Sequence, residues 1–179
     1  DFFFFFLAVF ALAVFSTILF IAIFAPWISP TNPYDLSSVD IMNSRLPPGT
    51  EDFAGNVYWL GTDGAGRDML SSIFYGLRVS LGVGAFSGIV AMAIGATIGL
   101  AAAYFGGQLE TIIMRIVDIQ LSFPSILMAL IILAIFGKGV DKTIIALVLV
   151  QWAYYARTAR ESALVEKNKE YVEAAQCLD

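Results

Sequence analysis

The chain has 179 residues, of which 59% are hydrophobic and only 14% are charged. A soluble domain carries about a quarter charged residues because water must wet its surface, so this composition predicts lipid as the surroundings of much of the chain. The net charge of -5 argues against a nucleic-acid partner. The absence of histidine excludes imidazole catalysis and imidazole metal ligands, and the single cysteine, Cys177, excludes an intramolecular disulfide.

Residues 1–25 are predicted to form the first transmembrane helix. About 20 apolar residues cross the hydrocarbon core of a bilayer, and the run from Phe2 to Ala25 is long enough. The run lacks a basic leading region and exceeds the apolar core of a signal peptide, so we interpret it as a membrane span.

Residues 26–66 are predicted to form a loop outside the lipid. The stretch is rich in proline, which lacks an amide donor and has a fixed φ angle. Its aromatic residues suit a membrane–water interface. They are Trp27, Tyr34, Tyr58 and Trp59.

The end of this loop, Leu60 to Asp68, contains the strongest turn signal of the chain. Asp63 can accept hydrogen bonds from nearby backbone amides, and Gly61, Gly64 and Gly66 permit positive φ angles. Glycine-rich loops can also cradle phosphate, but this one lacks the Gly-Lys-Ser/Thr ending of a nucleotide-binding loop. We therefore favour a structural role at the entry to the next helix.

The rest of the chain is predicted to be helical. Apolar residues recur at three- and four-residue steps in 67–78, which indicates an amphipathic interfacial helix. The spans 79–105, 112–136 and 142–158 follow, and short connections make them neighbours in space. The predicted fold class is an all-α polytopic transmembrane bundle with four spans in this chain.

Basic residues predict the orientation of the bundle. Arg157, Arg160, Lys167 and Lys169 follow the fourth span, and Arg115 lies near the start of the third. Basic segments favour the cytoplasm, so we expect 159–179 and the amino terminus inside and the proline-rich loop outside.

The second span contains a stripe of small residues three or four positions apart, Gly84, Gly88, Ala91, Gly95, Gly99 and Ala103. Small residues on one helical face let another backbone approach closely. The sequence leaves two interpretations open, a static contact and a surface that slides during a conformational cycle.

Polar residues in the third span also leave two interpretations open. Arg115 and Asp118 are three residues apart and can form an ion pair near the inner end of the helix. Alternatively, Asp118 faces a translocation path, for which Gln120 and Ser122 are further candidates.

Two other residues of the predicted bundle interior have structural and functional interpretations. Pro124 removes one backbone hydrogen bond and predicts a kink in the third span, which can shape a cavity in a transporter. Gln151 of the fourth span is a candidate for the translocation path, although a hydrogen bond between helices is the simpler interpretation.

Residues 159–179 alternate acidic and basic side chains, which is typical of a solvated helix that can dock on a soluble partner. The segment Glu170-Tyr171-Val172-Glu173-Ala174-Ala175-Gln176-Cys177-Leu178 resembles the Glu-Ala-Ala cytoplasmic loop of ATP-binding-cassette importer permeases. Three upstream segments resemble the C-type subunit of the dipeptide, oligopeptide and nickel permease branch. They are Leu60 to Asp63 with Gly66 to Asp68, Gly76 to Leu81, and Met114 to Pro124.

This resemblance implies an inner-membrane subunit of a bacterial importer. It implies a second permease chain that completes the translocation pathway, two cytoplasmic ATPase subunits that use ATP and Mg²⁺, and an extracytoplasmic solute-binding protein. This chain itself is then expected to be non-catalytic and to hold no cofactor or metal. Dipeptides, oligopeptides, nickel chelates and glutathione are the implied solutes.

The resemblance also implies the residues that contact the ATPase, and they are Glu170, Tyr171, Glu173, Ala174, Ala175, Leu178 and Asp179. The family pattern has glycine where this chain has Asp179. Two of the six spans expected of the family are missing, so we expect the chain to be a fragment of a longer protein.

Two other classes of function are less consistent with the sequence. An ion-coupled carrier or channel would use Asp118 and Gln151 in its path and need no ATPase. A membrane-embedded hydrolase would need catalytic residues, but the chain has no HExxH motif and no serine nucleophile elbow.

Overall fold

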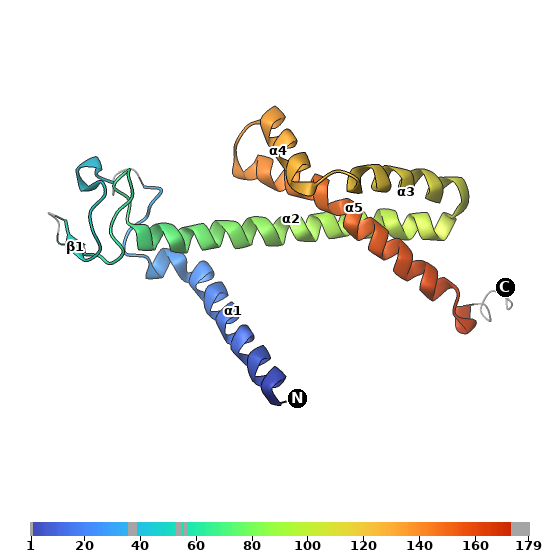
Figure 1. The fold of residues 1–179 in the computed structure, drawn as a ribbon, viewed down its shortest axis with the longest axis horizontal. Helices are drawn as coiled ribbons and strands as arrows, with labels where there is room; N and C mark the ends of the chain where they lie inside the picture. Colours follow the sequence, from blue (N-terminus) through green and yellow to red (C-terminus); the bar gives the residue numbers. More distant parts are fainter. Residues whose placement is uncertain (1, 36–38, 53–54, 56, 173–179) are drawn as a thin grey trace. The chain divides into compact units, whose positions relative to one another are not determined.

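The computed structural model describes residues 2–35, 39–52, 55 and 57–172, and the side chains of all of these except 2 and 3. The chain divides into two compact units, Asp1–Gly82 and Val83–Asp179. The described elements are α1 (Phe2–Ile28), the 3-10 helix η2 (Ile41–Asn43), β1 (Thr50–Glu51), β2 (Val57–Tyr58), α2 (Met69–Phe105), α3 (Gly107–Leu121), α4 (Ser125–Phe136) and α5 (Val140–Lys167) (Figure 1). The predicted all-α class is confirmed, and the described residues add one two-stranded antiparallel sheet, β1–β2.

Helix α1 is an uncharged helix with little of its surface buried in the protein. It is long and apolar enough to cross a membrane, as predicted for residues 1–25, and it continues three residues further to Ile28. Pro26 lies in the last turn, where it does not prevent the amide of Ser29 from donating to the carbonyl of Ala25 at 3.0 Å.

The loop after α1 is folded by its own hydrogen bonds. Strands β1 and β2 pair antiparallel, with Thr50 opposite Tyr58. Asp40 caps η2 by accepting a hydrogen bond from the amide of Met42 at 2.9 Å. Strands of two residues are too short to produce a hydrophobic period, so the sequence did not predict this hairpin.

Helix α2 runs without interruption through two segments that were predicted to be separate. Its 37 residues span about 55 Å, whereas a bilayer core is about 30 Å thick. The predicted interfacial helix 67–78 therefore forms the first turns of the same helix as the span 79–105, because no proline interrupts the hydrogen-bond ladder between them.

The first turns of α2 pack against the loop. The amide and hydroxyl of Thr31 both donate to the buried Ser71 hydroxyl oxygen, at 3.2 and 3.3 Å. The rings of Tyr34 and Tyr75 meet edge to face, with centroids 5.8 Å apart. These contacts hold the beginning of α2 on the polar loop.

The predicted third span, 112–136, is two helices. Helices α3 and α4 meet at an angle of 88° across Ser122, Phe123 and Pro124, and this corner is visible in Figure 1. The predicted kink at Pro124 is thus a complete break, because α3 ends at Leu121 before the proline is reached. The pair forms either one broken span or a re-entrant segment.

Helix α5 contains the predicted fourth span, 142–158, but combines an apolar first half with a charged second half. Among the described residues, α1 and α2 are long and apolar enough to cross a membrane, and the bent pair α3–α4 would make a third span. Helix α5 does not meet this criterion, so four spans stay a prediction.

The core of the second unit lies where α3 packs on α5. Val117 of α3 is fully buried against Ala153 and Ala156 of α5. Met114, Leu121 and Trp152 extend this contact. Many apolar side chains of the same helices are exposed, which fits helices whose outer faces are covered by lipid.

Helix α5 also crosses α2 within this unit at two glycines. A β-carbon at Gly95 would lie 2.3 Å from the carbonyl oxygen of Trp152, and one at Gly99 would lie 2.2 Å from that of Ala156. These atoms belong to backbone and cannot rotate away. The predicted small-residue contact is therefore present at Gly95 and Gly99.

The other half of the predicted stripe has no such contact. A β-carbon at Gly84 or Gly88 would meet nothing within 4 Å among the described residues. The stripe thus divides into a packed half and an open half.

We expect Gly99→Ala to destabilise the contact between α2 and α5, while Gly84→Ala serves as a matched control. Both changes gain the same helix propensity, but only the first creates a backbone clash, which costs about 1–3 kcal/mol. The midpoint of thermal unfolding of the full-length protein in detergent measures the difference. Equal midpoints for the two variants would show that the helices do not approach this closely.

Candidate functional site

Polar side chains connect α3 to the second half of α5, and Asp118 is one of them. One of the two interpretations of Asp118 was an ion pair with Arg115 on its own helix, but the carboxylate pairs with Arg157 of α5. The sequence did not indicate this partner because it lies in another helix. Asp118 is therefore part of a link between helices.

Glu110 and Arg160 form the second link. Arg160 Nε donates to Glu110 Oε1 at 2.8 Å, and a second nitrogen of the same guanidinium contacts that oxygen. The side chains of Arg160 and Glu110 are 31% and 20% exposed, less than those of Arg157 and Asp118. Lower exposure means weaker screening by solvent, so this pair contributes more to the packing of α3 on α5.

Gln120 forms a neutral third link. Its side-chain amide donates to the carbonyl oxygens of Leu149 and Val150, and its Oε1 accepts from the indole nitrogen of Trp152 at 3.0 Å. The hydrogen bond between helices that the sequence assigned to Gln151 is thus made by Gln120. Gln151 is half-buried, and its side chain has no hydrogen bond within the described part of the chain.

The break between α3 and α4 lies beside these links. The hydroxyl of Ser122 donates to the backbone carbonyl of Asp118 at 2.7 Å, so it helps to end α3. Pro124 precedes α4 without a side-chain cap, which leaves the first amides of α4 able to donate. The small pocket at the break is lined by Gln120, Leu121, Phe123, Ser125, Met128, Val150 and Tyr154.

The four candidate pathway residues thus have different environments. Asp118, Gln120 and Ser122 lie together near the end of α3, and the first two bind α5. Among them, Gln120 also borders the pocket at the break, whereas Asp118 lines a separate open groove. No other residue of the set is both at the pocket and hydrogen-bonded to α5.

The end of α5 is held by one contact with α2 and by hydrogen bonds to the residues that follow α5. Lys167 Nζ donates to the carbonyl of Ala103, one of the last carbonyls of α2, at 3.3 Å. Glu166 accepts from Lys169 at 2.6 Å and from the hydroxyl of Tyr171 at 2.8 Å. The hydrogen bond from Lys169 is the larger cause, and together with the one from Tyr171 it holds the pKa of Glu166 below its usual range.

The residues implied to contact an ATPase begin at Glu170, next to these hydrogen bonds. Glu170 and Tyr171 are exposed. Glu173, Ala174, Ala175, Leu178 and Asp179 lie outside the described residues. An apolar groove of about 550 Å³ adjoins the segment and is lined by Leu100, Ala103, Tyr104, Ala163, Glu166, Lys167 and Val172.

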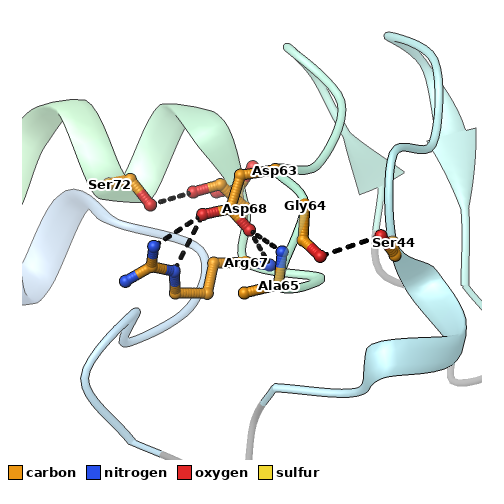
Figure 2. Close-up of polar contacts among 7 residues, drawn as sticks. All are labelled: Ser44, Asp63, Gly64, Ala65, Arg67, Asp68 and Ser72. Atoms are coloured by element: carbon orange, nitrogen blue, oxygen red, sulfur yellow. Dashed lines mark hydrogen bonds and ion pairs between the residues drawn. The ribbon is translucent and has the colours of Figure 1, made fainter.

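The glycine-rich loop of the first unit is organised around Asp63. Asp63 Oδ1 accepts from the amides of Ala65 and Arg67 at 2.8 and 3.0 Å, and Oδ2 accepts from Arg67 Nε at 2.8 Å (Figure 2). Burial alone would raise the pKa of Asp63, but these hydrogen bonds and the guanidinium charge outweigh it and hold that pKa below its usual range. The amides that could bind phosphate are thus occupied, which supports the structural interpretation.

Two glycines let other backbone segments approach this loop. Gly61 and Gly66 have φ angles of 75° and 81°, and β-carbons there would lie 2.4 Å from the carbonyl oxygen of Leu46 and 2.0 Å from that of Asp40. Ser44 completes the contact by donating its hydroxyl to the carbonyl of Gly64 at 3.0 Å (Figure 2).

Asp68 joins the loop to α2. Its Oδ2 accepts from the amide of Ser71 at 2.9 Å and from the Ser71 hydroxyl, and the hydroxyl of Ser72 donates to its backbone carbonyl at 2.8 Å. An aspartate in this position satisfies free amides at a helix start. Figure 2 shows the Ser72 bond beside the Asp63 cluster.

Sequence reasoning missed Glu110, Trp152 and the pairing roles of Arg157 and Arg160. The two arginines are three residues apart on one face of α5, which was a usable signal. Their partners are in another helix, however, and the register between two helices is not readable from one sequence. In the described part of the chain, no three carboxylates or cysteines gather into a group that could hold a metal.

Two family profiles match the chain. Residues 94–178 match the binding-protein-dependent transport system inner membrane component, and residues 7–48 match the N-terminal transmembrane domain of oligopeptide transport permease C. The first region contains α3, α4 and α5, and the second contains most of α1.

Individual relatives agree with these profiles. A dipeptide transport system permease protein of Escherichia coli K12 is 42% identical over 94% of this chain and 55% of its own length. A glutathione transport system permease protein of Pectobacterium atrosepticum is 39% identical over 90% and 52%. An oligopeptide transport system permease protein of Bacillus subtilis is 35% identical over 96% and 53%. The chain spans about half the length of the curated relatives it matches.

Exchanging the charges of Glu110 and Arg160 tests the link between α3 and α5. Glu110→Arg and Arg160→Glu should each destabilise the full-length protein, since each places like charges together. The double variant should recover about 0.5–3 kcal/mol relative to the sum of the single changes. Unfolding in detergent measures this coupling, and strictly additive effects would argue that the two side chains do not interact.

The pKa of Asp63 predicts an acid-sensitive loop. The pKa of Asp63 is lower in the folded protein than its ordinary value of 3.8. The ionised carboxylate therefore stabilises the fold above pH 3.8, and this stabilisation is lost as the pH falls through the pKa of the folded state. Asp63→Asn should remove that part of the pH dependence and leave a flatter profile below pH 3.8. Thermal unfolding measured against pH compares the two proteins, and parallel profiles would contradict the assignment.

Proposed function

The chain belongs to the family of binding-protein-dependent transport system inner membrane components, and from this premise we propose that it is part of the permease subunit of an ATP-driven importer. With a second permease chain it forms the translocation pathway. Two cytoplasmic ATPase subunits, which bind ATP and Mg²⁺, drive transport, and an extracytoplasmic binding protein delivers the solute. The chain itself contributes no catalytic residue.

Short peptides are the proposed solute. The names of these relatives refer to dipeptides, oligopeptides and glutathione, all of which contain amino acids joined by amide bonds. A dipeptide or short oligopeptide is therefore the chemistry that these relatives share.

The observation that carries the proposal is the way α5 leads into the Glu-Ala-Ala segment. Helix α5 is tied to α3 by the Glu110–Arg160 pair and to the end of α2 by Lys167. A segment that transmits force from an ATPase needs a rigid attachment to the helices that line the pathway. These contacts attach α5 to α3 and to the end of α2 within the second unit. The exposed residues Glu170 and Tyr171 follow α5 directly.

Asp118 is better explained by this proposal than by an ion-coupled carrier. A carboxylate that carries protons or cations must be free to exchange them, but Asp118 is paired with Arg157. The open half of the small-residue stripe, at Gly84 and Gly88, is a suitable surface for a helix of the second permease chain.

Reversing the charge of Glu173 tests the docking of the ATPase. In the full-length protein, Glu173→Lys should reduce co-purification of the ATPase subunits by about tenfold, because one opposed charge at a docking surface contributes about 1–2 kcal/mol. Glu161→Lys is the matched control, since Glu161 is exposed on α5 ahead of the segment. Equal recovery with both variants would remove Glu173 from the interface.

A further inference from the structure

Arg115 has no carboxylate partner among the described residues. Its expected partner, Asp118, is paired with Arg157, and Glu110 is paired with Arg160. The Arg115 side chain is exposed on α3. An uncompensated guanidinium on a helix of a membrane protein requires an anion or water to solvate it.

Arg115 borders an open polar groove between α3 and α5. The groove is lined by Glu110, Thr111, Met114, Arg115, Asp118 and Arg160. The groove contains the carboxylates of Glu110 and Asp118 and the guanidinium groups of Arg115 and Arg160, and Arg157 is paired with Asp118 from outside the lining. The net charge of these five groups is +1. The groove therefore favours a single negative charge.

An apolar stripe runs beside Arg115 on the same helix. Ile112, Ile116 and Ile119 are 59%, 52% and 63% exposed and, at steps of four and three residues, share one face of α3. Arg115 is three residues after Ile112 and four before Ile119, so it lies at the edge of that face. A positive charge and an uncovered apolar surface are thus adjacent.

We propose that this surface binds an anionic phospholipid of the inner leaflet. The lipid phosphate pairs with the Arg115 guanidinium at the mouth of the groove, and an acyl chain lies along Ile112, Ile116 and Ile119. A phospholipid joins one negative charge to an apolar chain, which is the combination that α3 presents. The flexible arginine side chain can reach the headgroup while its helix stays against the acyl region.

The charge complementarity distinguishes this occupant from others. Free phosphate would satisfy Arg115 but leave the isoleucine stripe uncovered. A carboxylate from a second permease chain would neutralise Arg115, but it would cover the isoleucine stripe as well only if it were carried by an apolar helix. Lipid surrounds a membrane protein at high local concentration, and it supplies both components in one molecule.

Titration with lipid tests the site in the full-length protein purified with its partner subunits and stripped of lipid. Native mass spectrometry counts bound phosphatidylglycerol for the wild-type protein, Arg115→Gln, Arg115→Lys and the control Arg78→Gln, which removes an exposed arginine of α2. Arg115→Gln should weaken binding of the site by about fivefold, since one arginine near an anionic headgroup contributes about 1 kcal/mol. Arg115→Lys should retain most of the binding, and Arg78→Gln should leave it unchanged.

Two further measurements separate the alternatives. Inorganic phosphate at the same concentration should not displace phosphatidylglycerol, and displacement would identify a free-phosphate site. A photoreactive residue in place of the exposed Ile116, with Arg115 retained, should crosslink to lipid in membranes, whereas crosslinking to protein, whether this chain or another, would overturn the proposal. Unchanged lipid binding by Arg115→Gln, with a wild-type unfolding temperature, would overturn it as well.

Discussion

The close approach of α5 to α2 at Gly95 and Gly99 is the constraint that fixes where these two helices cross in the second unit. No other residue type leaves room for the carbonyls of Trp152 and Ala156 at these positions. Once α5 lies there, its second half presents Arg157 and Arg160 to α3. The helix that crosses α2 at these two glycines is therefore the same one that holds α3 through polar links.

The break between α3 and α4 explains why so many polar groups gather near one point. A helix that ends inside an apolar region exposes carbonyl and amide groups, which need partners because lipid offers none. Ser122 binds a carbonyl at the end of α3, and Gln120 binds the backbone and indole of α5 alongside it. Gln120 thus keeps the end of α3 attached to α5.

The sequence predicted what depends on local pattern. It predicted the first span from its length, the Asp63 turn from its residue types, and a close helix contact from the small-residue stripe, which is present at Gly95 and Gly99. It did not indicate Arg157 as the partner of Asp118, and it assigned the interhelical amide to Gln151, because both depend on which faces of two helices meet. The division of α2 at residue 78 also failed, since an amphipathic pattern alone does not interrupt a helix.

The contact at Gly95 and Gly99 is made against main-chain atoms of α5, and this has a mechanical consequence. A neighbour that is a side chain can absorb a small displacement by changing its rotamer, but a carbonyl group cannot. A movement of α2 toward α5 at these points therefore pushes on the backbone of α5, the helix that also carries Arg157 and Arg160. Within this unit the two glycines therefore set a lower limit on the separation of α2 and α5 that side-chain rearrangement cannot relax.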